Sequence, residues 1–204
     1  MKFHIVTFGC QMNDADSAWL ELALTRRGWE HVPEEQARVF VVNTCSVREK
    51  PEHKVYSLLG RLKRHCEGRD GFICVGGCVA QQVGREFWRR FPRVRLVFGP
   101  DGLASVPDSL EKLTARPGLR ISLLDFADSY QERDFSRVPG KAPIQAYVSI
   151  MQGCDNFCAY CIVPYTRGRQ KSRSSSKILQ ECSELVRAGT REITLLGQNV
   201  NSYG

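Results

Sequence analysis

Short apolar segments of strand length alternate with amphipathic segments of helical length through the first half of the chain. Strands are expected at residues 3–8, 39–42, 71–75 and 94–98. Helices are expected at residues 14–27, around 55–62 and at 80–91. Strands and helices that alternate in this way predict an α/β fold with a mainly parallel sheet and helices packed on its faces.

A polar segment with several turn residues, 128–143, interrupts this alternation and is interpreted as a linker. A strand at 146–150, a helix at 175–188 and a strand at 192–196 follow, which together make one β-α-β unit. We therefore expect a first domain at 1–127, a linker at 128–143, and the beginning of a second domain at 144–204.

The size and charge of the chain narrow the class of protein. Its 204 residues suffice for one core, or for one domain and part of another. The apolar runs are only of strand length and no signal peptide opens the chain, so we expect a soluble cytoplasmic protein with no membrane span. The net charge is +7, and basic residues concentrate at 85–95 and 159–177. Such clusters suit a polyanion, but a solvated basic face is an equally good interpretation.

Nine cysteines are many for a protein without an export signal, and their odd number argues against a disulfide framework. Cys154, Cys158 and Cys161 place three thiolates on one short loop after a strand. Structural zinc needs four ligands, and this loop offers neither a histidine nor a fourth cysteine. Three thiolates on a four-iron cluster leave one iron open to bind a substrate, which is the interpretation we favour over a disulfide with a spare thiol.

A second set of three cysteines is far apart in the sequence. Cys10, Cys45 and Cys78 each follow the carboxyl end of one of the first three predicted strands. Ligands of open parallel sheets gather outside these strand ends, so the three thiols are expected to meet and to hold a second cluster. Cys66, Cys74 and Cys182 fall on apolar stripes or within a strand and are interpreted as structural.

The loop G-C-D-N-F-C-A-Y-C at 153–161 resembles the signature loop of radical S-adenosylmethionine enzymes. The resemblance implies that the open iron binds the amino and carboxylate groups of S-adenosylmethionine, and that one electron from the cluster cleaves it to a 5′-deoxyadenosyl radical. It also implies that Tyr160 contacts the adenine, although packing within the protein is an equally good role for this ring.

Two clusters in one chain resemble the methylthiotransferase family, whose amino-terminal domain supplies the second cluster. The stretches that carry this resemblance are F-G-C-Q-M-N at 8–13, N-T-C-S-V-R-E-K at 43–50, G-G-C-V-A-Q at 76–81, F-G-P at 98–100, I-V-P-Y-T-R-G-R at 162–169 and L-L-G-Q-N-V-N-S-Y-G at 195–204. The fold implied is a parallel-sheet methylthiotransferase domain followed by the first β-α-β part of a radical S-adenosylmethionine partial barrel.

Within this family, the last two stretches resemble most the branch that acts on tRNA. The resemblance implies methylthiolation at C2 of N6-isopentenyladenosine next to the anticodon, with two 4Fe-4S clusters and with S-adenosylmethionine as methyl donor and radical source. The implied partners are the tRNA anticodon stem-loop and an electron donor such as a flavodoxin or ferredoxin, and we expect a monomer. Arg167, Arg169 and Arg173 are candidates for phosphate contacts; no residue is assigned a catalytic role.

Two alternatives remain open. A sister enzyme would modify threonylcarbamoyl-adenosine in tRNA or an aspartate of a ribosomal protein, whereas a non-catalytic iron–sulfur or zinc protein would only bind RNA. The barrel of the family has more βα units than the single one expected here. We therefore expect a truncated chain, the amino-terminal portion of such an enzyme, that does not complete turnover alone.

Overall fold

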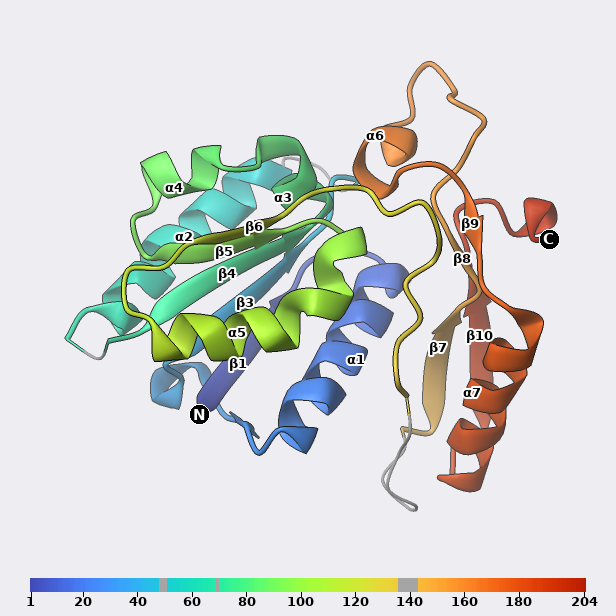
Figure 1. Ribbon diagram of the computed structural model, residues 1–204, viewed down its shortest axis with the longest axis horizontal. Helices are drawn as coiled ribbons and strands as arrows, with labels where there is room; N and C mark the ends of the chain where they lie inside the picture. Colours follow the sequence, from blue (N-terminus) through green and yellow to red (C-terminus); the bar gives the residue numbers. More distant parts are fainter. Residues whose placement is uncertain (48–50, 69, 136–142) are drawn as a thin grey trace.

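The computed structural model describes residues 1–47, 51–68, 70–135 and 143–204. Its largest element is a six-stranded sheet in which every pair of neighbouring strands is parallel (Figure 1). The strands follow the spatial order β2 (Glu30–His31), β1 (Lys2–Thr7), β3 (Val39–Thr44), β4 (Phe72–Gly77), β5 (Val94–Phe98) and β6 (Ile121–Leu123). The expected α/β fold with a parallel sheet is confirmed.

Helices cover both faces of this sheet (Figure 1). One face carries α1 (Gln11–Arg26) and α5 (Val106–Ala115), and the other carries α2 (Pro51–Cys66), α3 (Cys78–Val83) and α4 (Glu86–Arg90). The central strand β3 is buried at every position, because Phe40 and Val42 pack toward α2 while Val39 and Val41 pack toward α1 and α5. Strands buried on both faces explain the nearly continuous apolar runs of the sequence.

A smaller unit lies beside the sheet. Its strands β7 (Gln145–Ser149) and β10 (Glu192–Leu196) pair in parallel and pack against α7 (Ser175–Arg187). The short strands β8 (Met151–Gln152) and β9 (Lys171–Ser172) pair antiparallel and enclose the segment that contains α6 (Val163–Arg167). Three short 3₁₀ turns complete the described elements: η1 (Glu34–Gln36), η2 (Asp101–Ser105) and η3 (Val200–Ser202).

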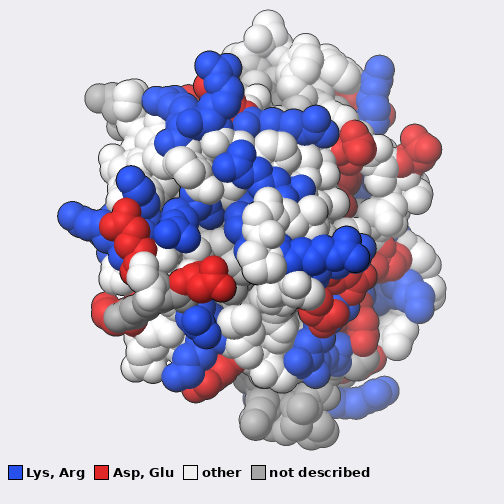
Figure 2. All heavy atoms as spheres, turned by 60° about the vertical axis from the view of Figure 1, so that its left-hand side comes forward, with Lys and Arg blue, Asp and Glu red and all other residues white. Residues whose placement is uncertain are grey.

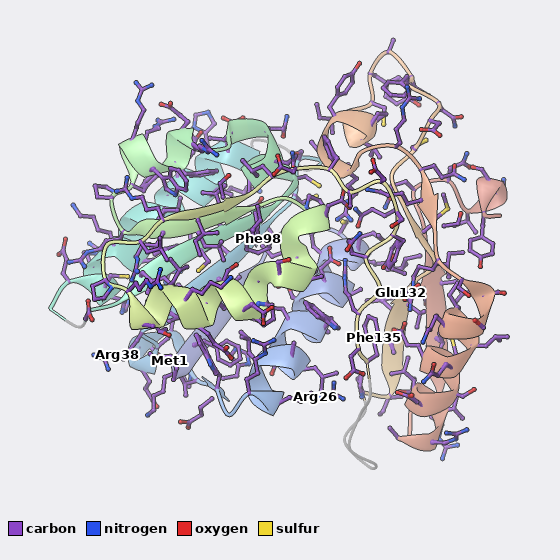
Figure 3. All side chains as sticks on the ribbon, in the orientation of Figure 1. Met1, Arg26, Arg38, Phe98, Glu132 and Phe135 are labelled. Carbon is purple, nitrogen blue, oxygen red and sulfur yellow. The ribbon has the colours of Figure 1, made fainter. Side chains whose placement is uncertain are left out.

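The two units are in direct contact. Helix α1 packs against β7, and α3 contacts α6. The coil that follows β6 passes between them, and Glu132 and Phe135 lie on it beside α1 and β7 (Figure 3). The Trp19 indole donates a hydrogen bond to the Asp134 carbonyl (3.2 Å), so α1 also holds this coil. The described part of the predicted linker, 128–135, contains no helix or strand, while 136–142 lie outside the described residues.

One expectation for the helices was wrong. The single helix expected at 80–91 is two helices, α3 and α4, because Gly84 leaves the helical conformation with a φ of 58°. Helix α5 and the edge strand β6 were not predicted at all. Within the described ranges, none of the helices has the length and apolar character that crossing a bilayer requires.

Candidate functional site

Cys10, Cys45 and Cys78 come together at one edge of the large sheet. Cys10 immediately precedes α1, Cys45 follows β3, and Cys78 is the first residue of α3 after β4. The thiols of Cys10 and Cys45 are within hydrogen-bonding reach of each other, and Cys45 also interacts electrostatically with Cys78. Cys45 and Cys78 are buried and Cys10 is partly buried. The structure therefore brings the three sequence-distant thiols to one place.

Backbone geometry allows this approach. Gly9, just before Cys10, has a φ of 122°, a backbone conformation that residues other than glycine rarely adopt. A Cβ at this position would collide with the Cβ of Cys45 and would lie 2.9 Å from its sulfur. Glycine is thus required for the loop that carries Cys10 to lie against the loop that carries Cys45.

A buried asparagine connects the same loops. The Asn13 amide donates hydrogen bonds to the carbonyls of Phe8 (2.9 Å) and Thr44 (2.8 Å). Its carbonyl oxygen accepts a hydrogen bond from the Cys10 thiol (3.6 Å). Asn13 is completely buried, and these contacts satisfy both polar groups of its side chain. They also fix the positions of the Cys10 loop and the Cys45 loop relative to each other.

The third loop is fixed by the hydroxyl of Thr44. It donates to the Gly76 carbonyl (2.6 Å) and accepts from the backbone N–H groups of Val79 (3.1 Å) and Ala80 (3.3 Å). These two N–H groups lie in the first turn of α3, where they have no partner within the helix. One side chain therefore positions Cys45 and Cys78 relative to each other.

The thiols differ in their affinity for protons. A hydrogen bond from Cys45 lowers the pKa of Cys10 to about 6, although burial opposes the charged form. Backbone N–H groups at the start of α1 and the positive charge of Arg167 lower it further. The pKa of Cys45 is raised, first by its hydrogen bond to Cys10 and then by burial. Thiolate is the form that binds metal, and Cys10 is already biased toward it.

Cys154, Cys158 and Cys161 lie on the segment between β8 and β9. The Cys154 N–H donates to the Gly168 carbonyl (3.2 Å), and the Cys161 N–H donates to the Cys158 carbonyl (2.9 Å). Gly153, with a φ of 82°, donates its N–H to the Gln198 side chain (2.7 Å), and a Cβ there would collide with the Arg169 carbonyl. Cys154 is buried, Cys158 is exposed and Cys161 is partly exposed. Hydrogen bonds thus hold the base of the segment at Gly153 and Cys154, which we call its neck. The part around Cys158 and Cys161, which we call its tip, is accessible to solvent.

The donor chemistry fits iron–sulfur clusters. All nine cysteines are free thiols, and a set of three thiolates suits such clusters better than structural zinc, which takes four ligands. In the described part of the chain, no three Cys, His, Asp or Glu side chains are grouped as ligands of one metal ion. A four-iron cluster has a different requirement, because each thiolate binds a different iron of the cube. Ligation by the six cysteines stays a prediction.

Comparison with known proteins finds two family models and several relatives that match this chain. Residues 2–99 match the family described as Uncharacterized protein family UPF0004, and residues 148–204 match the Radical SAM superfamily. Relatives from Oleidesulfovibrio alaskensis (63% identical over 203 residues), Nitratidesulfovibrio vulgaris (61% over 203) and Lawsonia intracellularis (53% over 210) are each named tRNA-2-methylthio-N(6)-dimethylallyladenosine synthase. Over 99–100% of its length, the chain is therefore similar to part of proteins with this name.

The alignments with these three relatives cover 99%, 99% and 100% of this chain, but only 44%, 45% and 46% of the relatives. The chain thus spans a little under half the length of these methylthiotransferases. Both matched regions contain one set of three cysteines, so each set lies in a part of the chain that the family shares.

The three arginines proposed for phosphate contacts occupy different environments. Arg167 and Arg173 are each only 3% exposed. Arg173 pairs with Glu181 (2.6 Å) and Glu132 (3.0 Å), so its charge is used within the protein. Their burial does not support phosphate contacts by Arg167 and Arg173. Arg169 is exposed, lies 3.5 Å from the Asp155 carboxylate and stacks over the ring of Phe157 (4.6 Å to the ring centre), so it is the one of the three that solvent can reach.

Tyr160, the predicted adenine contact, is 92% exposed. Its ring therefore has no packing role in the core of the described chain, and it stands at the accessible tip beside Cys158 and Cys161. Sequence reasoning missed Asn13 as a supporting residue. The available signal was its position in the first turn of the helix that follows Cys10.

Figure 2 shows that basic residues also gather on one face of the large sheet unit. From the predicted cluster at 85–95, Arg85, Arg89 and Arg90 are exposed on and beside α4. Arg95 instead donates hydrogen bonds to the carbonyls of Leu113 (2.7 Å) and Leu119 (3.0 Å) and so supports the fold. Only part of this cluster is therefore free to meet a polyanion.

Proposed function

We propose that this chain holds two 4Fe-4S clusters and S-adenosylmethionine and takes part in the methylthiolation of a tRNA adenosine. The observation that supports this proposal most is that Cys10, Cys45 and Cys78 meet at the carboxyl ends of the strands. This end of the sheet lies against α6, the helix that follows Cys161, through the contact of α3 with α6. One set of thiols binds each cluster in this scheme, and the packing of α3 on α6 supports a fixed arrangement of the two sites.

When bound at Cys154, Cys158 and Cys161, the cluster would supply the electron that cleaves S-adenosylmethionine. The chain's own residues bind and orient. The exposed tip between Cys158 and Cys161 leaves room for the cofactor, with Tyr160 placed to contact its adenine. Asn13 and Thr44 keep the other three thiols in position, and burial of Cys45 and Cys78 limits the access of water to that site.

The substrate in this proposal is N6-isopentenyladenosine beside the anticodon, modified at C2. The printed names of the relatives, which refer to dimethylallyladenosine in tRNA, support it. S-adenosylmethionine would serve both as methyl donor and as radical source. The exposed Arg169 and the exposed arginines beside α4 would contact phosphates of the anticodon stem-loop. A cytoplasmic monomer that receives electrons from a flavodoxin or ferredoxin is consistent with this role.

Anaerobic reconstitution of the chain with iron and sulfide tests the cluster content. Two clusters would give about eight irons per chain. Replacing Cys154, Cys158 and Cys161 by Ala should remove half of the iron and all cleavage of S-adenosylmethionine, and replacing Cys10, Cys45 and Cys78 should remove the other half. Cys182→Ala is the matched control and should retain the full content. A chain that binds zinc, or loses no iron in either triple variant, would refute the proposal.

The identity of the nucleoside needs a separate experiment. In a strain that lacks the gene, mass spectrometry of tRNA nucleosides should show the loss of the methylthio form of isopentenyladenosine. Loss of methylthio-threonylcarbamoyl-adenosine, or of a modified ribosomal aspartate, would instead identify a sister enzyme. Unchanged nucleosides and proteins would favour a protein that only binds RNA.

A further inference from the structure

Arg167 lies at the three-cysteine site although it belongs to the other unit of the fold. It is the last residue of α6, and its guanidinium donates a hydrogen bond from Nη2 to the Asn13 side-chain oxygen (2.9 Å). The Cys10 thiol donates to this same oxygen. Helix α6 also packs on α3, which begins with Cys78. The guanidinium is therefore next to the thiols through two independent contacts.

The other terminal nitrogen of Arg167, Nη1, is buried and has no partner of acceptable hydrogen-bond geometry among the described residues, although the guanidinium lies within reach of the Cys78 thiol. A buried N–H donor that is left unpaired is costly and calls for an explanation, such as an absent ion or group. Here the neighbouring groups are thiols that would become thiolates on binding a cluster, and these are acceptors.

The charged side chains around Arg167 also indicate that an anionic partner belongs beside it. Asp16 pairs with Arg133 (2.7 Å) and also approaches Arg167 (3.7 Å), and all three side chains are at most 7% exposed. A single carboxylate thus faces two guanidinium groups. An anionic group beside the cysteines would compensate the second positive charge.

We propose that Arg167 is a positioning residue for the cluster held by Cys10, Cys45 and Cys78, and that its Nη1 donates a hydrogen bond to a sulfur atom of that cluster. This inference rests on the function proposed above. Since Arg167 ends α6, the helix that follows Cys161, it connects the loop of Cys154, Cys158 and Cys161 to the cluster site of Cys10, Cys45 and Cys78. Donors to cluster sulfur stabilise the reduced form, which carries the greater negative charge, and so raise the reduction potential.

The test uses the full chain with Cys154, Cys158 and Cys161 replaced by Ala, so that a single cluster remains. In this background Arg167→Met should shift the midpoint potential of the cluster to more negative values, measured by a redox titration followed by electron paramagnetic resonance. It should also make the cluster lose iron to a chelator faster, because removing a supporting hydrogen bond typically weakens metal binding by roughly tenfold or more. Arg167→Lys keeps the positive charge but loses the planar set of N–H donors of the guanidinium. It should therefore shift the midpoint potential in the same direction by a smaller amount.

A matched control separates this role from a general loss of positive charge. Arg169→Met removes an exposed charge from the same segment and should leave the potential unchanged. If Arg167→Met does not fold, the Arg167→Lys result decides. Equal potentials and iron-loss rates for the parent and the folded Arg167 variants would overturn the inference. A parent that binds no cluster would instead overturn the proposed function.

Discussion

At the scale of single residues, the approach of Cys10 to Cys45 depends on the absence of a side chain between them. Gly9 combines a positive φ with direct contact to Cys45, whereas Gly28 has a positive φ of 78° but open space around its Cα. The two glycines therefore separate the cost of backbone strain from the cost of a steric clash.

Gly9→Ala should lower the free energy of unfolding by about 2–4 kcal/mol, the sum of left-handed strain and overpacking against Cys45. Gly28→Ala should cost only about 1–2 kcal/mol, because the added methyl group meets no atom. Chemical denaturation of the metal-free, reduced chain measures both values. Equal losses would mean that the loops can move apart, and that the close contact of Cys10 with Cys45 is not needed for stability.

The cysteines could be predicted from the sequence, but the residues that support them could not. Strand-end positions are enough to bring Cys10, Cys45 and Cys78 to one sheet edge. The role of Arg167 was not accessible in this way, because a basic cluster in the sequence does not distinguish a surface arginine from a buried one. Its burial results from the contact of α6 with α3, which joins residues far apart in the chain.

At the scale of secondary-structure elements, the beginning of α3 is the critical point of the site. Most helices and strands around it follow from apolar periodicity. Helix α5 was also visible in principle, since Val106, Leu110 and Leu113 have helical spacing and are completely buried. The break between α3 and α4 was less accessible, because a glycine such as Gly84 is compatible with a continuous helix until tertiary packing decides its conformation.

Thr44→Val tests how α3 is held. The substitution conserves shape but removes the hydroxyl that bonds Gly76, Val79 and Ala80, so it should lower the free energy of unfolding by about 1–3 kcal/mol. Thr114→Val removes a hydroxyl that donates to the Glu111 carbonyl on the exposed side of α5 and should change stability by less than about 0.5 kcal/mol. Urea denaturation compares the two. A Thr44 variant as stable as its control would show that α3 begins independently of this hydroxyl.

At the scale of the whole molecule, buried ionic contacts join the sheet unit to the smaller unit. Asp101 of η2 pairs with Lys171 of β9 (2.5 Å), and both side chains are at most 6% exposed. Asp101 also accepts hydrogen bonds from the Gln152 side chain (2.6 Å) and the Ala127 N–H (3.1 Å). One carboxylate thereby holds β8, β9 and the coil between the units. These long-range pairs have no signature in the sequence, which is why only the units themselves could be predicted, and not how they pack.

Asp101→Ala should therefore lower the free energy of unfolding of the chain by more than the loss of one ion pair would. Removing a carboxylate from a buried pair leaves Lys171 charged and unpaired, which costs about 3–5 kcal/mol of unfolding free energy. The control Asp108→Ala removes the partner of Arg27 on the surface, where Asp108 is 64% exposed, and should cost less than about 1 kcal/mol. Both values follow from chemical denaturation. If the two variants lost the same stability, the contact at Asp101 could not hold the neck of the Cys154–Cys161 segment against the sheet unit.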